Sequence, residues 1–176
     1  IGDWFGWRAM FYIAAGIMML CLLLTLGVMP DMQPNFTGTY RGLMQSVVDI
    51  FRNHPKIRLN SIRAAFGFGS MLSFWACLAF HLADAPFHAG SDAVGYLGLC
   101  GVAGAIVASG IGKYIAQYGV KPFSMFGASG QMAAWSVAFL FGHSYAGLIA
   151  AIILVDIGLQ CQQLSNQSAC IQEVPE

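Results

Sequence analysis

Four polar side chains near the end of the chain share one face of a predicted helix. They occur at intervals of four, three and four residues inside an apolar segment, at Asp156, Gln160, Gln163 and Gln167. Residues at these intervals lie above one another on an α-helix. A charged carboxyl group deep inside an apolar helix costs at least ~2.5–3.5 kcal/mol on membrane-insertion scales, so it usually faces a bundle interior, a partner or a water-filled cavity.

This polar stripe has two interpretations. Asp156 could bind a proton or a cation while the three glutamines hydrogen-bond a solute that passes along them. The same four side chains could instead form an interhelical hydrogen-bond network that fixes the packing of a bundle. The sequence leaves both interpretations open.

Two residues in an earlier apolar segment could take part in the same chemistry. Trp75 lies in the middle of that segment, where it faces either a cavity or the lipid and core. Arg63 lies near one end of the segment. Its guanidinium group either extends to the membrane surface along its apolar stem or closes a gate on that side.

The composition of the chain restricts the fold that can hold these residues. Of its 176 residues, 57% are hydrophobic and only 9% are charged, whereas an average soluble domain has about 25% charged residues. So few charges cannot cover a globule of this size with hydrated side chains, which predicts an integral membrane protein. Eight basic and eight acidic residues cancel, so nothing supports a nucleic-acid partner.

Five apolar segments are long enough to cross a bilayer as helices. A hydrocarbon core of roughly 30 Å requires about 20 helical residues. The segments are 9–29, 62–83, 94–115, 123–141 and 146–169. The sequence therefore predicts an all-α polytopic membrane protein with five transmembrane helices.

Basic residues gather on one side of these spans. Seven of the eight lie in the connection 30–61, at the start of the helix that follows it, or in the turn 113–122. Both connections lie on the same side of the membrane, and Arg8 lies on the other. Because cytoplasmic loops are enriched in Lys and Arg, we expect this basic side to be cytoplasmic, with residue 1 outside and residue 176 inside.

The connection between the first two spans contains a predicted amphipathic helix at 40–53. Apolar side chains recur at helical spacing at Leu43, Val47, Ile50 and Phe51, and Pro55 follows the end of the helix. This helix lies either in the cytoplasmic membrane interface or on the cytoplasmic ends of the spans.

The turn between the third and fourth spans carries part of a known motif. Gly112, Gly119 and Lys121 match the glycines and the last basic position of a Gly-x-x-x-Asp-Arg-x-Gly-Arg-Lys turn. Ala116 and Gln117 stand where the motif has its acidic and basic residues. The turn resembles the weaker, C-terminal copy of this motif in the major facilitator superfamily. Without the acidic residue no charge latch is expected, and the glycines would support close packing and a tight turn.

The resemblance extends over nearly the whole chain. A helix opened by Gly6-Trp7-Arg8, a connection ending at His54-Pro55 and four further helices are similar to helices six to ten of a twelve-helix transporter. Segment 155–167 resembles helix ten of a bacterial efflux-type branch. On this resemblance, 1–29 holds the outer flank and last helix of the N-terminal half. Residues 30–61 form the cytoplasmic central loop, and 62–176 form four helices of the C-terminal half.

The resemblance also implies a function. It implies secondary active transport of a small solute by alternating access, coupled to protons, of efflux type and located in the inner membrane. The polar stripe and Trp75 would border the central cavity, and Arg63 and the motif turn would serve gating. The lipid bilayer and the remainder of the chain would be partners, no cofactor is expected, and the protein would not be an enzyme.

Two other classes of membrane protein compete with this interpretation. A metal- or haem-binding enzyme subunit could use side chains on the predicted outer side, namely His81, Asp84, His88 and His143, although their spacing matches no compact ligand motif. A structural membrane subunit without transport activity is the other class, and the polar stripe argues against it.

Overall fold

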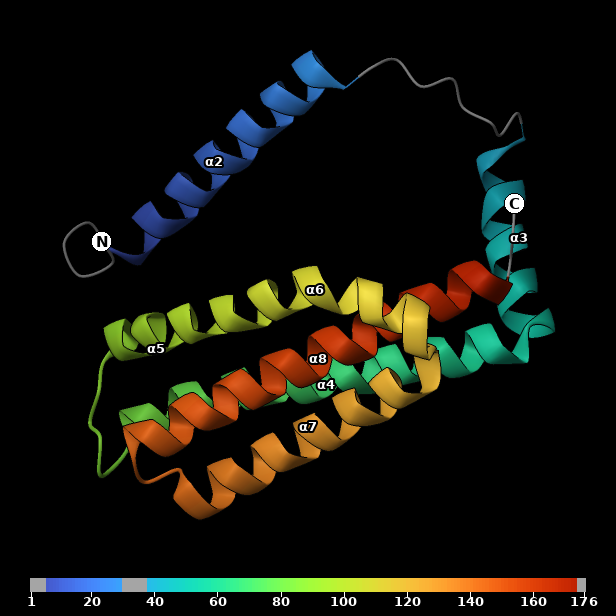
Figure 1. Ribbon diagram of the computed structural model, residues 1–176. Helices are drawn as coiled ribbons and strands as arrows, with labels where there is room; N and C mark the ends of the chain where they lie inside the picture. The colour runs from blue at the N-terminus through green and yellow to red at the C-terminus, as the bar shows by residue number, and fades with distance from the viewer. Residues whose placement is uncertain (1–5, 30–37, 174–176) are drawn as a thin grey trace. The chain divides into compact units, whose positions relative to one another are not determined.

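The computed structural model describes residues 6–29 and 38–173, and these residues are almost entirely helical, without strands. They divide into two units, Ile1–Leu43 and Met44–Glu176, which are described separately (Figure 1). The sides of the membrane on which residues 1 and 176 lie were predicted above, but both residues lie outside the described part of the chain. The predicted all-α fold class is confirmed.

The first unit contains helix α2 (Trp7–Val28), which agrees with the predicted span 9–29. It is long and apolar enough to cross a membrane. Its large apolar side chains are exposed on every face, as at Phe11, Met18 and Leu24. A helix that is apolar all round is typical of a segment surrounded by lipid or by other helices.

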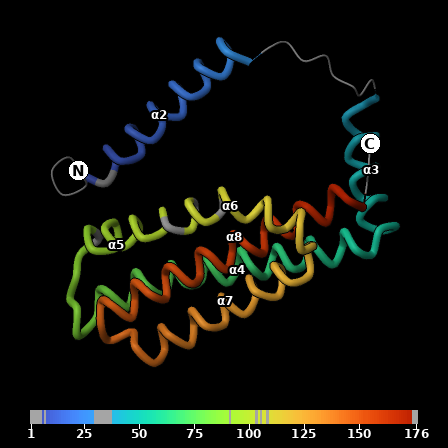
Figure 2. Tube along the Cα trace, in the orientation of Figure 1, coloured from blue at the N-terminus to red at the C-terminus, as the bar shows by residue number. Residues whose placement is uncertain are grey.

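The second unit is a bundle of antiparallel helices. Its elements are α4 (Pro55–Ala83), α5 (Ser91–Gly98), the 3₁₀ turn η1 (Leu99–Gly101), α6 (Val102–Tyr118), α7 (Val120–Phe141) and α8 (Tyr145–Glu173). They run side by side along their length (Figure 2). One end of the bundle holds the start of α4, the α6–α7 turn and the end of α8, and we call it the basic end.

Helix α8 lies at the centre of this bundle. It packs against α7, α4 and α6, whereas these three helices have few direct contacts with one another. The most deeply buried core side chains therefore include Ile152 and Val155 of α8 together with Leu82 of α4. The central position of α8 is what buries the residues of its polar stripe.

Close backbone approach holds α7 against α8. A methyl group added to Gly127 would lie 2.6 Å from the carbonyl oxygen of Gly158, and one added to Gly158 would lie 2.9 Å from the carbonyl oxygen of Gly127. No side chain fits at either position without displacing a backbone. We call this contact the glycine seam, and small residues are the usual means by which membrane helices approach closely.

Three helices in the described residues meet the length and hydropathy of a membrane span: α2, α4 and α8. The predicted span 94–115 is helical, but η1 divides it, which leaves α6 with 17 residues. The predicted span 123–141 is helical as α7, and its polar content, including Ser124 and Gln131, lowers its hydropathy. All five predicted segments are helices, and these two are less apolar or less regular than expected.

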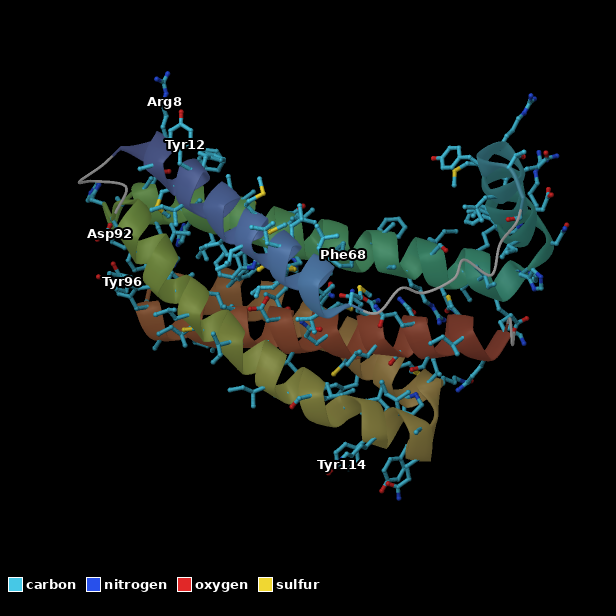
Figure 3. All side chains as sticks on the ribbon, turned by 90° about the horizontal axis from the view of Figure 1, so that it is seen from above. Arg8, Tyr12, Phe68, Asp92, Tyr96 and Tyr114 are labelled. Atoms are coloured by element: carbon cyan, nitrogen blue, oxygen red, sulfur yellow. The ribbon has the colours of Figure 1, made fainter. Side chains whose placement is uncertain are left out.

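Two exposed tyrosines mark the ends of the segment that η1 divides. Tyr96 projects from α5 and Tyr114 from the far part of α6 (Figure 3). They are about 27 Å apart along the axis at roughly 1.5 Å per residue, which is close to the ~30 Å of a bilayer core. Tyr is enriched at both membrane interfaces, so this spacing fits a membrane-crossing segment.

Helix α4 begins earlier than the predicted span, at Pro55 instead of residue 62. Proline is favoured at the first position of a helix, where its missing N–H has no intrahelical partner to lose. Only His54 separates α4 from the amphipathic helix α3 (Tyr40–Asn53), whose predicted bounds are confirmed. No described residue of α3 is buried.

Candidate functional site

Asp156 lies near the middle of α8 with its side chain 7% exposed. It faces the part of the neighbouring segment where η1 joins α6. A methyl group added to Gly101 would lie 2.9 Å from a carboxylate oxygen of Asp156, and one added to Gly104 would lie 3.0 Å from its Cβ. The carboxyl group thus fits between α8 and the η1–α6 segment because Gly101 and Gly104 have no side chains.

Trp75 of α4 completes the surroundings of this carboxyl group. Its half-buried indole makes a side-chain hydrogen-bonding contact with Asp156, and the indole N–H is its only donor. The Asp156 side chain of α8 therefore lies between α4 and the η1–α6 segment. Sequence reasoning selected Asp156 and Trp75 separately, and the structure brings them together.

The three glutamines of the polar stripe differ in burial. Gln160 and Gln163 are half-buried, and Gln167 is exposed. The stripe thus changes from buried to exposed between Asp156 and the basic end. No hydrogen bond joins the stripe residues to one another in the described part of the chain, and both the solute-path and the interhelical-network interpretations stay predictions.

A second polar contact, which sequence reasoning missed, lies on another face of α8. Gln131 of α7 donates a hydrogen bond from Nε2 to Oε1 of Gln162 over 3.3 Å, and both residues are buried. The Gln162 amide also occupies the space that a side chain at Gly67 of α4 would need. A glycine lies four residues before each of these glutamines, Gly127 before Gln131 and Gly158 before Gln162. This shared spacing is the sequence signal that could have indicated the contact.

More buried polar residues lie nearer the basic end. Ser165 donates a hydrogen bond to the Cys161 carbonyl oxygen over 2.6 Å. Asn166 is 5% exposed, and neither polar atom of its side chain has a hydrogen-bond partner among the described residues. Asn60 of α4 and Ser124 of α7 are also buried. The bundle therefore becomes more polar inside as it approaches this end.

The predicted gating and turn residues also lie at the basic end, away from Asp156. Gly119 has φ = +87° and joins α6 to α7 without a loop, which is the expected tight turn. Gly112 does not pack closely, because a methyl group there would meet nothing within 4 Å. Arg63 and Lys121 line one cavity at this end, a juxtaposition that their sequence positions do not reveal.

The histidines considered for metal binding do not form a ligand set. His81 shares a hydrogen bond with the Gly142 carbonyl oxygen over 2.8 Å, and its ring packs against Phe87. Within residues 6–29 and 38–173, no three His, Cys, Asp or Glu side chains come together as a metal site would require. His81 instead ties α4 to the α7–α8 turn.

A bundle of apolar helices that buries the carboxyl group of Asp156 among them is typical of a polytopic membrane protein. The family model of the Major Facilitator Superfamily matches residues 1–176. The chain belongs to the Major Facilitator Superfamily, a family of membrane transporters and not of enzymes.

Curated relatives agree with this family. The chain is 28% identical over 172 residues to "Uncharacterized transporter YgaY" of Escherichia coli O157:H7. The aligned region covers 97% of this chain and 43% of the relative. It is 27% identical over 173 residues to "Probable transporter SCO4007" of Streptomyces coelicolor, covering 97% of this chain and 40% of that relative. The chain thus spans about two fifths of the length of these relatives. No solved structure matches it significantly.

Proposed function

We propose that this chain forms part of a secondary active transporter that moves a small solute by alternating access and couples this movement to protons. The observation that carries the proposal is Asp156, a carboxyl group buried in the candidate span α8 against Gly101 and Gly104. Ionisable residues at such depth usually serve an ion or substrate path. A group that gains and releases a proton between two conformations would connect proton flow to solute movement.

The surroundings of Asp156 support a role in proton or cation binding. The Trp75 indole can donate a hydrogen bond to the carboxyl group, and its ring face can attract a cation. The small surface of Gly101 and Gly104 lets α6 shift against α8 without a clash of large side chains. A 3₁₀ turn inside a helix often marks a hinge, and η1 lies beside Asp156.

We further propose the arrangement of the whole protein. Residues 1–29 would hold the last helix of an N-terminal half, 30–61 the central loop, and 62–176 four helices of a C-terminal half. The basic end would be cytoplasmic, because most Lys and Arg residues lie there, and the membrane would be the bacterial inner membrane. On the resemblance of segment 155–167 alone, the direction of transport would be efflux, and with proton coupling the transporter would act as an antiporter.

The test replaces Asp156 by asparagine in the full-length protein that contains this chain. In everted membrane vesicles, a fluorescent pH indicator follows proton release on addition of ethidium, an aromatic cation, and of a panel of amino acids and sugars. We expect Asp156→Asn to abolish solute-dependent proton release while membrane insertion stays unchanged. Asp92→Asn, which alters an exposed carboxylate on α5, is the matched control and should retain it.

A second measurement needs no substrate. Infrared difference spectra between acidic and alkaline buffer should contain a carboxylic-acid band that Asp156→Asn lacks and Asp92→Asn retains. Coupling through Asp156 is wrong if Asp156→Asn vesicles still release protons on addition of solute, or if the difference band survives in this variant.

A further inference from the structure

The basic end of the bundle contains a cavity of about 340 Å³ between the first turns of α4 and α7 and the last turns of α8. Three cationic side chains line it: Lys56 and Arg63 from α4 and Lys121 from α7. Lys121 lies 58 residues after Arg63, and the packing of α4 and α7 in the bundle brings the two residues to one cavity. The cavity lies well away from Asp156, so it is a separate feature of the fold.

The cationic groups are not balanced by carboxylates. Lys56 forms an ion pair with Glu173 over 2.8 Å. Neither Arg63 nor Lys121 has an ion-pair partner within the residues that the structure describes. Among the described residues, three cationic groups thus stand against one carboxylate, that of Glu173, and this excess of positive charge attracts an anion.

The start of α7 adds to this positive potential. Val120 and Lys121, its first two residues, both line the cavity. The residue before them is Gly119, which has no side chain to cap their free backbone N–H groups, and the third residue of the turn, Pro122, has no N–H. Uncapped N–H groups at a helix N-terminus carry partial positive charge and bind anions such as phosphate.

Two buried polar side chains point to the same kind of ligand. Asn60 of α4 is 6% exposed and Ser124 of α7 is 7% exposed, and both line the cavity. Neither side chain hydrogen-bonds another residue within the described ranges of the chain, and their polar atoms, unlike those of Asn166, are not fully enclosed. Buried polar groups normally have hydrogen-bond partners, and the Asn60 amide and the Ser124 hydroxyl can both donate to an anionic oxygen.

We propose that this cavity is a binding site for a phosphate group, carried by an anionic phospholipid or free as inorganic phosphate. An arginine guanidinium pairs with phosphate through two parallel hydrogen bonds, and lysines and a helix N-terminus add charge. The cavity is larger than one phosphate group, and the exposed apolar side chains of Leu59 and Met125 also line it. These features suit a headgroup with the first part of its acyl chains, and the site does not depend on the proposed transport function.

The experiment uses the full-length protein in detergent micelles and measures bound lipid by native mass spectrometry. Phosphatidylglycerol and phosphatidylcholine are added in equal amounts, and a separate arm measures the thermal shift in inorganic phosphate against chloride at matched ionic strength. We expect phosphatidylglycerol to bind at least tenfold more tightly than phosphatidylcholine. A shift with phosphate alone would identify a free anion, and preference for phosphatidylglycerol alone would identify a lipid.

Matched variants test whether binding occurs in this cavity. Arg63→Gln combined with Lys121→Gln should weaken phosphatidylglycerol or phosphate binding at least tenfold. Arg58→Gln combined with Lys113→Gln removes the same charges from exposed positions that do not line the cavity and should leave binding intact. Ser124→Ala, a small change inside a helix, should weaken binding severalfold without loss of folding.

Three results would overturn the proposal. The first is wild-type protein that binds neither phosphatidylglycerol nor phosphate more strongly than phosphatidylcholine or chloride. The second is an equal loss of binding in both double variants, which would indicate a general effect of surface charge. Binding unchanged in both the cavity double variant and Ser124→Ala would place the anion elsewhere.

Discussion

A methyl group at Gly127 should force α7 away from α8. It would lie 2.6 Å from the carbonyl oxygen of Gly158 and 2.7 Å from the backbone nitrogen of Gln162. Favourable separations between non-bonded heavy atoms are about 3.5–4.0 Å, so the two helices must move apart by roughly 1 Å. The atoms in conflict belong to a helix backbone, which cannot rotate away as a side chain can.

The size of the effect follows from two opposing contributions. Overpacking of this kind costs about 1–3 kcal/mol, and alanine in place of glycine in a helix contributes roughly 0.5–1 kcal/mol of stability. We therefore expect Gly127→Ala to lower the free energy of unfolding by about 1 kcal/mol, and by at most about 2.5 kcal/mol, taking these two values together. Separation of the helices would also lengthen the Gln131–Gln162 hydrogen bond beyond 3.3 Å.

Gly130 provides the matched control on the same helix. An added methyl group there would lie 3.4 Å from the Gly158 Cα, its nearest neighbour, which is an ordinary contact. Gly130→Ala should therefore be as stable as the wild type or slightly more stable. The assay is reversible unfolding of the full-length protein in mixed micelles, titrated with a denaturing detergent and followed by tryptophan fluorescence. Equal stability of the two variants would refute the role assigned to the glycine seam.

Two further predictions concern side-chain contacts. Leucine at Gln131 or Gln162 leaves the other buried amide without its partner, so each single variant should lose about 1–3 kcal/mol of stability. A double-mutant cycle should give a coupling energy of about 0.6–1.7 kcal/mol between the two residues. Strictly additive losses would contradict a direct interaction. The lysine side chain of the Lys56–Glu173 ion pair is 74% exposed, so Lys56→Gln should change the free energy of unfolding by less than about 1 kcal/mol. In the same unfolding assay, high salt should remove this difference between the variant and the wild type.

Much of the fold could be predicted from the sequence because apolar length is a strong signal. The starts and ends of α2, α7 and α8 agree with the predicted segments within a few residues, apart from the last turn of α8. The position of Asp156 in the bundle interior was also predicted, since a carboxyl group in an apolar span has few alternatives. Pro55 was interpreted correctly as following α3, but its role as the first residue of α4 was not recognised.

The contacts between helices could not be predicted in the same way. In a membrane span both the lipid-facing and the helix-facing surfaces are apolar, so periodicity does not reveal which face meets which neighbour. The Gln131–Gln162 contact depends on the glycine seam, and the cavity at the basic end depends on Arg63 and Lys121, which lie 58 residues apart. The assignment of Gln167 to the same path as Asp156 rests on spacing alone and stays a prediction.

The central position of α8 has a consequence for biosynthesis. Helices α4, α6 and α7 meet chiefly through α8, and α8 is the last of them to leave the ribosome. Until α8 inserts, the buried amide of Gln131 has no Gln162 to hydrogen-bond. A ribosome stalled before Tyr145 would thus hold α4, α6 and α7 without the helix that joins them.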